Sequence, residues 1–168
     1  MPLFLNTHVN KVDRKGRVSV PASFRAALSD QAALGQGAGT PPSFSGPSFN
    51  GIVAFPSFRA PAIEVLDRER MEQLSSSADD LAQFSERRDD LAATIFAAAA
   101  ELPFDGEGRI ILPKNMADHA GITELAAFVG MGRTFQIWNP DGFERYRREA
   151  ATRVREQGGA LILRADKR

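Results

Sequence analysis

Cysteine is absent from this chain of 168 residues, and that absence excludes several kinds of chemistry. Without thiols there is no disulfide framework, no thiolate metal site and no thiol nucleophile. Histidine is nearly as scarce: His8 and His119 are the only two, and we interpret each as a packing or surface residue. Catalysis needs acid, base or nucleophile groups that converge, and no phosphate-cradling glycine motif is present. The sequence therefore predicts a protein that is not an enzyme and that needs no metal and no cofactor.

Long hydrophobic runs are missing too. The longest nearly apolar stretch covers residues 92–100 and includes Thr94, which leaves it far short of the roughly 20 residues that a membrane span needs. The N-terminal residues, MPLFLNTHVNK, have no basic segment ahead of an apolar one, so we expect no secretory signal. These features predict a cytoplasmic protein that does not bind membranes.

Net charge is also lacking, since 21 basic residues balance 21 acidic ones. A neutral chain does not coat nucleic acid by bulk charge, but a local patch is still compatible with neutrality. The charges are unevenly spread. Residues 10–25 carry a net charge of plus four, whereas residues 102–117 carry none. The excess comes from five basic residues against one acid: Lys11, Arg14, Lys15, Arg17 and Arg25 against Asp13.

What the sequence does contain is one short pattern written twice. Residues 10–21 read NKVDRKGRVSVP and residues 102–113 read LPFDGEGRIILP. The alignment superimposes four pairs of identical residues: Asp13 and Asp105, Gly16 and Gly108, Arg17 and Arg109, and Pro21 and Pro113. Such an internal repeat indicates one structural module built twice.

Each half of the chain is predicted to run hairpin, helix, hairpin, helix. The first half contributes strands at 4–12 and 17–20, a helix from Pro21, strands at 51–58 and 61–66, and a helix over 67–76. The second contributes strands at 101–104 and 109–112, a helix over 113–119, strands at 126–131 and 134–138, and a helix from Asn139. A helix over 79–100 is the clearest of all, because its apolar residues form a stripe and alanine favours helix.

These elements predict an α+β protein with three parts. A first module covers residues 1–78, a linking helix with a second module covers 79–156, and a tail covers 157–168. Residues 31–51 are rich in Gly, Pro and Ser and are interpreted as a long loop; an insertion without a role is favoured over a binding loop that uses Phe44 and Phe49. A half of this size has a thin core, so we expect the two halves, or several chains, to pair.

The repeated Asp-x-x-Gly-Arg has a structural interpretation first. Asp at the start of a turn accepts backbone N–H groups, and an Arg four residues later can bond to that carboxylate. For Asp105 and Arg109 this bracing role is sufficient. The first copy differs because Arg14 and Lys15 stand at the central turn positions, where the second copy has Gly106 and Glu107.

With Lys11 and Arg17, the residues Arg14 and Lys15 place cations along one edge. A protruding basic ribbon suits the major groove of double-stranded DNA, and Arg can pair with guanine. The sequence thus predicts a brace present twice and a DNA-contacting surface present once. A solvated surface loop is the plain alternative for these residues.

With these motifs, the chain resembles the MraZ family of bacterial transcriptional regulators. The resemblance rests on VDRKGRVSVPASFR (residues 12–25), DGEGRIILP (105–113), HAGI (119–122) and FQIWNPDGFERY (135–146). It implies two tandem SpoVT/AbrB-like modules in a pseudo-two-fold arrangement. It also implies a DNA-binding repressor that acts at the start of a division and cell-wall gene cluster, located on the nucleoid in the cytoplasm.

The resemblance further implies homo-oligomeric rings whose hairpin tips line up along promoter repeats. The first DxxxR of the family falls on Asp13 and Arg17, the second on Asp105 and Arg109, and the basic tip on Arg14 and Lys15. Residues 31–51 depart from the family pattern by their length, which bears on ring size. An alternative of another class is a non-catalytic assembly module of the same fold, whose basic tip binds a partner protein.

Overall fold

The computed structural model describes residues 3–34, 50–81 and 84–159. Residues 35–49 and 160–168, which make up most of the predicted loop 31–51 and of the predicted tail 157–168, lie outside that part. The loop prediction is wrong at its start, because the helix Ala22–Leu34 includes residues 31–34, where Ala32, Ala33 and Leu34 favour helix. The elements follow in this order: β1 (Thr7–Lys11), β2 (Arg17–Ser19), α1 (Ala22–Leu34), β3 (Gly51–Pro56), β4 (Ala62–Leu66), α2 (Arg68–Asp79), α3 (Glu86–Thr94), β5 (Ala100–Pro103), β6 (Arg109–Ile111), α4 (Lys114–Ala120), β7 (Leu125–Gly130), β8 (Phe135–Trp138) and α5 (Pro140–Glu156).

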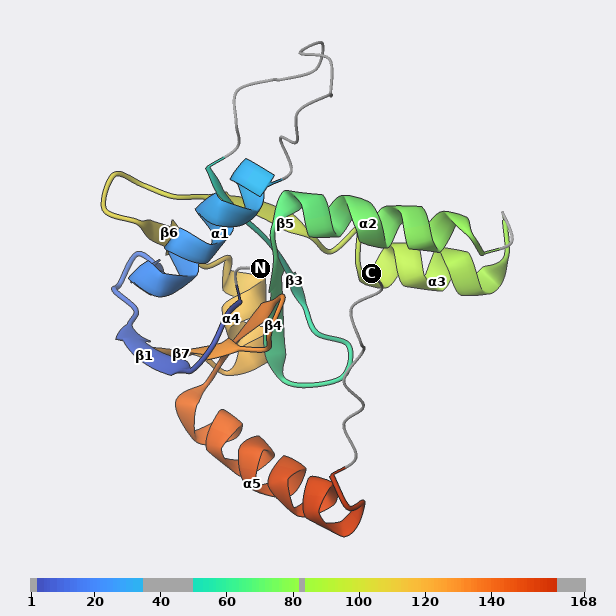
Figure 1. The fold of residues 1–168 in the computed structure, drawn as a ribbon. Helices are drawn as coiled ribbons and strands as arrows, with labels where there is room; N and C mark the ends of the chain where they lie inside the picture. Colours follow the sequence, from blue (N-terminus) through green and yellow to red (C-terminus); the bar gives the residue numbers. More distant parts are fainter. Residues whose placement is uncertain (1–2, 35–49, 82–83, 160–168) are drawn as a thin grey trace.

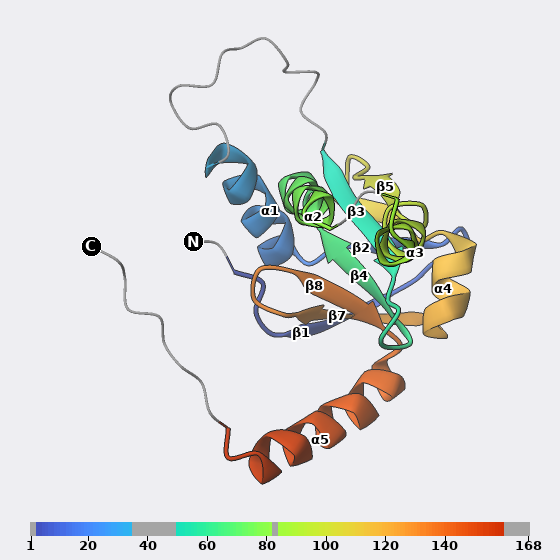
Figure 2. The same ribbon diagram turned by 90° about the vertical axis from the view of Figure 1, so that its right-hand side faces the viewer.

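A six-stranded sheet in the order β1-β7-β8-β4-β3-β5 forms the body of the molecule, and every neighbouring pair in it is antiparallel. A separate ribbon of β2 and β6 lies over it (Figures 1 and 2). The predicted α+β class is therefore confirmed. Strands from residues 1–78 (β1, β4 and β3) and from residues 79–156 (β7, β8 and β5) are intermixed within the one sheet. The division into two modules stays a prediction. No helix among the described residues has the length and apolar character needed to cross a bilayer.

The two strands that flank each repeated turn do not pair with each other, so the prediction of two local hairpins is wrong. β1 pairs with β7 and β2 pairs with β6, while β5 pairs with β3. Only the turns are formed by residues close in the sequence. We attribute the pairing between halves to burial: each half has few apolar residues, and strands paired across the halves let them share one core that neither half could form alone.

That core lies on one face of the sheet, beneath α1, α4 and the β2–β6 ribbon. Its largest members are rings in mutual contact: Phe24 lies 5.4 Å from Phe4 and 4.9 Å from Phe135, centroid to centroid. A smaller cluster on the opposite face centres on Trp138, which packs against Phe143 and Tyr146 of α5. These two rings are the residues by which α5 packs on the sheet.

The predicted helix over 79–100 is confirmed only over α3; of the other described residues in that range, Asp79 alone is helical, as the last residue of α2. α2 ends at Asp79, and α3 begins after Ser85, whose hydroxyl accepts the backbone N–H of Arg88 at 3.2 Å. Phe84 separates them with a left-handed φ of 61°. At the other end, Ala100 joins β5 opposite Ala54 of β3. Strand pairing overrides the helical propensity of Ala100, since propensity is a weak preference.

The other helix boundaries are set by local side chains and by a glycine. Asp67 caps α2 by accepting the backbone N–H of Arg70 at 2.6 Å. Asn139 caps α5, with Pro140 in its first turn. Gly121 closes α4 in the left-handed conformation at φ 64°. Both histidines also hold packing or surface positions: His8 meets the Phe24 ring edge-on, and the His119 ring lies 3.2 Å from the Ala60 carbonyl oxygen.

Candidate nucleic-acid interface

The first repeated turn is held by a single carboxylate. Asp13 Oδ1 accepts the backbone N–H groups of Lys15 at 3.0 Å and Arg17 at 2.8 Å. Its Oδ2 accepts Arg17 Nε at 2.6 Å. The Asp13 N–H donates in return to the Arg17 carbonyl at 3.0 Å, and Gly16 completes the turn at φ 79°. An L-residue rarely adopts that conformation, so the glycine is required by the backbone.

The second turn repeats these bonds with matching geometry. Asp105 Oδ1 accepts the N–H groups of Glu107 and Arg109, both at 2.9 Å, and Oδ2 accepts Arg109 Nε at 2.8 Å. Gly108 has a φ of 75°. One difference is added: the Arg109 guanidinium also pairs with Glu107 at 3.1 Å. The predicted brace therefore has one construction, built twice.

These bonds keep both carboxylates ionised. The backbone N–H of Arg17, together with its side chain, lowers the pKa of Asp13 below its ordinary value. The backbone N–H of Arg109 does the same for the pKa of Asp105. In return, the hydrogen bond to Asp105 raises the pKa of Arg109. Hydrogen bonds donated to a carboxylate favour its charged form, so each turn stays braced at neutral pH.

The β2–β6 ribbon places the two turns at its opposite ends. Val18 lies opposite Ile110, the equivalent residue of the other copy, with the strands antiparallel. Each turn also bonds to the other copy: Leu112 N–H donates to the Gly16 carbonyl at 2.9 Å, and Val20 N–H donates to the Gly108 carbonyl at 3.2 Å. The repeat thus forms a local two-fold arrangement in which each turn supports the other.

The cations of the first copy lie where a partner can reach them. We call Lys11, Arg14, Lys15 and Arg17 the basic tip. Lys11, Arg14 and Lys15 are exposed and form no ion pair with any described residue. The Arg17 side chain is 34% exposed while bonded to Asp13. Arg14 and Lys15 therefore lie on the braced turn itself, while Lys11 ends β1 before it and Arg17 begins β2 after it.

The second turn presents a different surface. Glu107 is exposed and engages Arg109, and Gly106 has no side chain. Lys114, the next cation along the chain, pairs with Asp118 at 2.8 Å. The charge asymmetry of the sequence is therefore also an asymmetry of the folded surface, on two turns of the same geometry.

Arg25 is a residue whose place the sequence did not indicate. It contributes to the net charge of the first copy, yet its guanidinium lies over Gly108 of the second turn, so close that a β-carbon there would come within 2.5 Å. Its Nε donates to the Val20 carbonyl at 3.2 Å. Only the exchange of strands brings α1 beside the second turn. The close approach gives Gly108 a second reason, besides its φ, to be glycine.

Chemically, the basic tip can bind a polyanion. Long cationic side chains on a rigid turn contact phosphates, which set position, and Arg can also read guanine in the major groove. The turn is rigid because the Asp13 carboxylate holds two backbone N–H groups and one guanidinium, so binding does not have to order the backbone.

A family model described as "MraZ protein, putative antitoxin-like" matches residues 95–164. The chain is 43% identical over 169 residues to a protein named Transcriptional regulator MraZ from Gluconacetobacter diazotrophicus, covering 95% of this chain and 99% of the relative. Proteins of the same name from Pelagibacter ubique and Rickettsia rickettsii are each 44% identical, covering 86% and 87% of this chain and 83% and 87% of their own lengths.

Proposed function

This chain belongs to the MraZ family, and from that membership we propose that it is a transcriptional regulator that binds double-stranded DNA through its basic tip. The family resemblance in the sequence pattern is thereby confirmed. We further propose that it acts as a repressor of a division and cell-wall gene cluster, on the nucleoid in the cytoplasm.

One observation carries the assignment of the tip. Two turns share the same fold and the same Asp–Arg brace, but only the first bears unpaired exposed cations. A brace alone would need no Arg14 or Lys15, as the second turn demonstrates with Gly106 and Glu107. Since DNA carries about one negative charge per 1.7 Å of its axis, exposed cations at that turn complement it.

We propose that the protein binds DNA as a homo-oligomeric ring of tandem SpoVT/AbrB-like modules. A neutral monomer with four useful cations binds DNA weakly at physiological salt. Linking several tips converts later contacts into intramolecular ones, which raises avidity by about 10² to 10⁴. The low charge of one chain and the expected promoter repeats therefore call for several copies.

The test is a turn replacement followed by a gel shift. The double variant Arg14→Gly/Lys15→Glu gives the first turn the central residues of the second, which already support the same backbone geometry, so the variant folds. With the DNA upstream of this gene as probe, the shift should disappear. A shift equal to that of the unmodified protein would reject the assignment and favour the alternative of an assembly module.

A second pair of variants distinguishes the DNA-contacting role of the first turn from the bracing role that both turns share. Arg17→Ala should abolish the shift, because Arg17 belongs to the basic tip. Arg109→Ala removes the equivalent brace from the second turn and should lower thermal stability while leaving binding to the probe measurable. If the two variants lose DNA equally at a temperature where both are folded, the distinction between the turns is wrong.

A further inference from the structure

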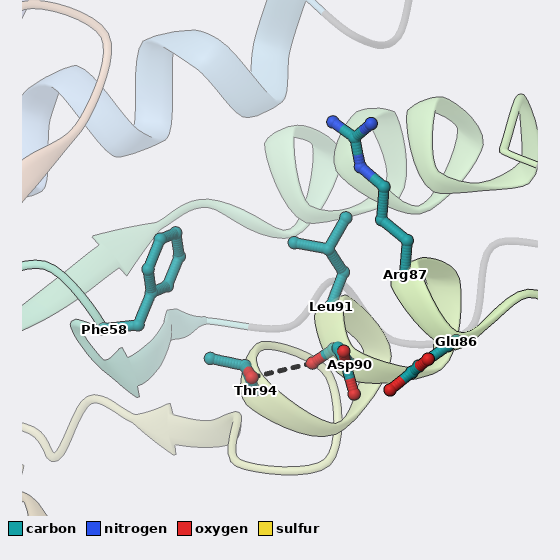
Figure 3. Close-up of a pocket in the computed structure, with 6 residues that line it drawn as sticks. All are labelled: Phe58, Glu86, Arg87, Asp90, Leu91 and Thr94. Carbon is teal, nitrogen blue, oxygen red and sulfur yellow. Dashed lines mark hydrogen bonds between the residues drawn. The ribbon is translucent and has the colours of Figure 1, made fainter.

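An open groove lies away from the basic tip, between α3 and the turn that joins β3 to β4. Its volume is about 660 Å³, within the range of about 300–1,000 Å³ that ligand sites occupy. Figure 3 shows Phe58, from the turn, across from Leu91 and Thr94 of α3. Glu86, Arg87 and Asp90 complete the lining.

The groove has an apolar floor that remains partly exposed, although the Arg59 guanidinium lies 5.9 Å from the centroid of the Phe58 ring. Phe58 is 59% exposed, although a ring of this size is among the side chains most often buried. Leu91 is half-buried, and α2 and α3 contain no buried residue. An exposed aromatic beside an aliphatic side chain, rimmed by charges, marks an interaction site rather than a solvated surface.

The charged residues that line the groove are acidic in sum: Glu86 and Asp90 oppose one cation, Arg87. None of the three forms an ion pair with a described residue. Arg59, which lies over the Phe58 ring, is not part of the lining. Asp90 takes part through its backbone instead, since its carbonyl accepts the Thr94 hydroxyl at 2.7 Å. A fitting occupant therefore combines aliphatic side chains with positive charge.

The chain contains such a segment beyond the described residues. Residues 160–168 read ALILRADKR: three aliphatic residues, Leu161 to Leu163, followed by Arg164 and a net charge of plus two for the segment. The family match extends to residue 164 and so includes the aliphatic part. We propose that this segment of one copy docks in the groove of a second copy, its aliphatic residues against Phe58 and Leu91 and Arg164 beside Glu86 or Asp90.

The direction of α5 indicates whether the segment docks in the groove of its own chain or in that of a second copy. α5 contacts the sheet through Phe143 and Tyr146, and residues 151–159 are all exposed. Figures 1 and 2 both show its C-terminal end well apart from α3. Leu161 to Leu163 follow Gly159 by two to four residues, which span at most about 7–14 Å. The helix thus carries the segment away from its own groove and toward a neighbour.

This inference deepens the proposed oligomer and rests on it. A segment of one copy in the groove of the next is a head-to-tail contact, which closes into a ring when the rotation allows. The contact lies on other elements than the basic tip, so it leaves the tips free for DNA.

The experiment uses single cysteines in the otherwise cysteine-free full chain. Thr94→Cys places a thiol on the exposed side of the groove, and Ile162→Cys places one in the segment. Mixed in equal amounts and oxidised, they should form a disulfide-linked dimer of twice the 18.3 kDa chain mass, at least tenfold faster than Ile162→Cys mixed with Thr7→Cys, an exposed position on β1. Adding Phe58→Ser to the Thr94→Cys chain should remove that advantage, with circular dichroism confirming the fold.

Two results would overturn the proposal. One is a Thr94→Cys mixture that links no faster than the Thr7→Cys mixture. The other is a chain carrying both Thr94→Cys and Ile162→Cys that closes its disulfide within a monomer. The readout contains no DNA, so loss of the cross-link with an intact gel shift rejects this contact alone, whereas an intact cross-link without a shift rejects the DNA proposal.

Discussion

Neutralising the exposed cations of the basic tip, singly and together, measures how many DNA phosphates the tip contacts, through the salt dependence of binding. Lys11, Arg14 and Lys15 are exposed and unpaired among the described residues, so replacement by Gln removes charge without breaking a bond of the fold. Each phosphate contact contributes a slope of about −0.9 to the logarithm of affinity against the logarithm of salt concentration. The triple variant should therefore lose about 2.7 from the slope for each bound tip.

The same slope sets the size of the effect. Between 50 and 200 mM salt, one contact changes affinity by about 3.5-fold and three contacts by about 40-fold. The assay is fluorescence anisotropy with a labelled duplex, repeated across a salt series for each variant. Lys114→Gln is the matched control, because Lys114 is equally cationic but pairs with Asp118 at 2.8 Å on α4. An unchanged slope in the triple variant, or an equal loss in the control, would refute the assignment of the tip.

Two further predictions concern the fold that supports the tip. Phe24→Ala should lower the free energy of unfolding by about 3–5 kcal/mol in urea titrations, since Phe24 is 1% exposed and contacts Phe4 and Phe135. The control Val154→Ala, at a side chain 57% exposed on α5, should change it by at most about 0.5 kcal/mol. Because folding lowers the pKa values of Asp13 and Asp105, these groups take up protons in the unfolded chain before they do so in the folded one as the pH falls. The two carboxylates therefore stabilise the fold fully above their ordinary pKa of 3.8. That stabilisation is lost as the pH drops through 3.8 and then through the lower folded-state pKa values. Melting temperatures recorded between pH 6 and pH 3 should fall less steeply for Asp13→Asn/Asp105→Asn than for the unmodified chain, and parallel curves would contradict this.

The local turns were predictable because their causes are local. The Asp–Arg spacing, the glycine and the central residues all lie within one turn of chain, and the brace forms between residues four apart. The caps at Asp67 and Asn139 were predictable for the same reason, because a cap depends on one side chain and the backbone two or three residues on.

The errors share a different cause. Alanine at 97–100 favours helix by a few tenths of a kcal/mol per residue. At Ala100 this preference is outweighed by pairing with Ala54 of β3, which lies 46 residues earlier in the chain. No local pattern in β1 or β2 predicts that these strands pair with β7 and β6. The position of Arg25 over Gly108 depends on that exchange, so no signal in the sequence near Arg25 could have revealed it.

By itself, the sequence determined two braced turns of one construction and the placement of unpaired cations on only one of them. Those properties depend on residue identity and short spacing. The tertiary structure alone decided which strands share a sheet, which surfaces face each other across the β2–β6 ribbon, and that a groove beside α3 remains uncovered. Those properties depend on burial, which is settled only when segments far apart in the chain compete for one core.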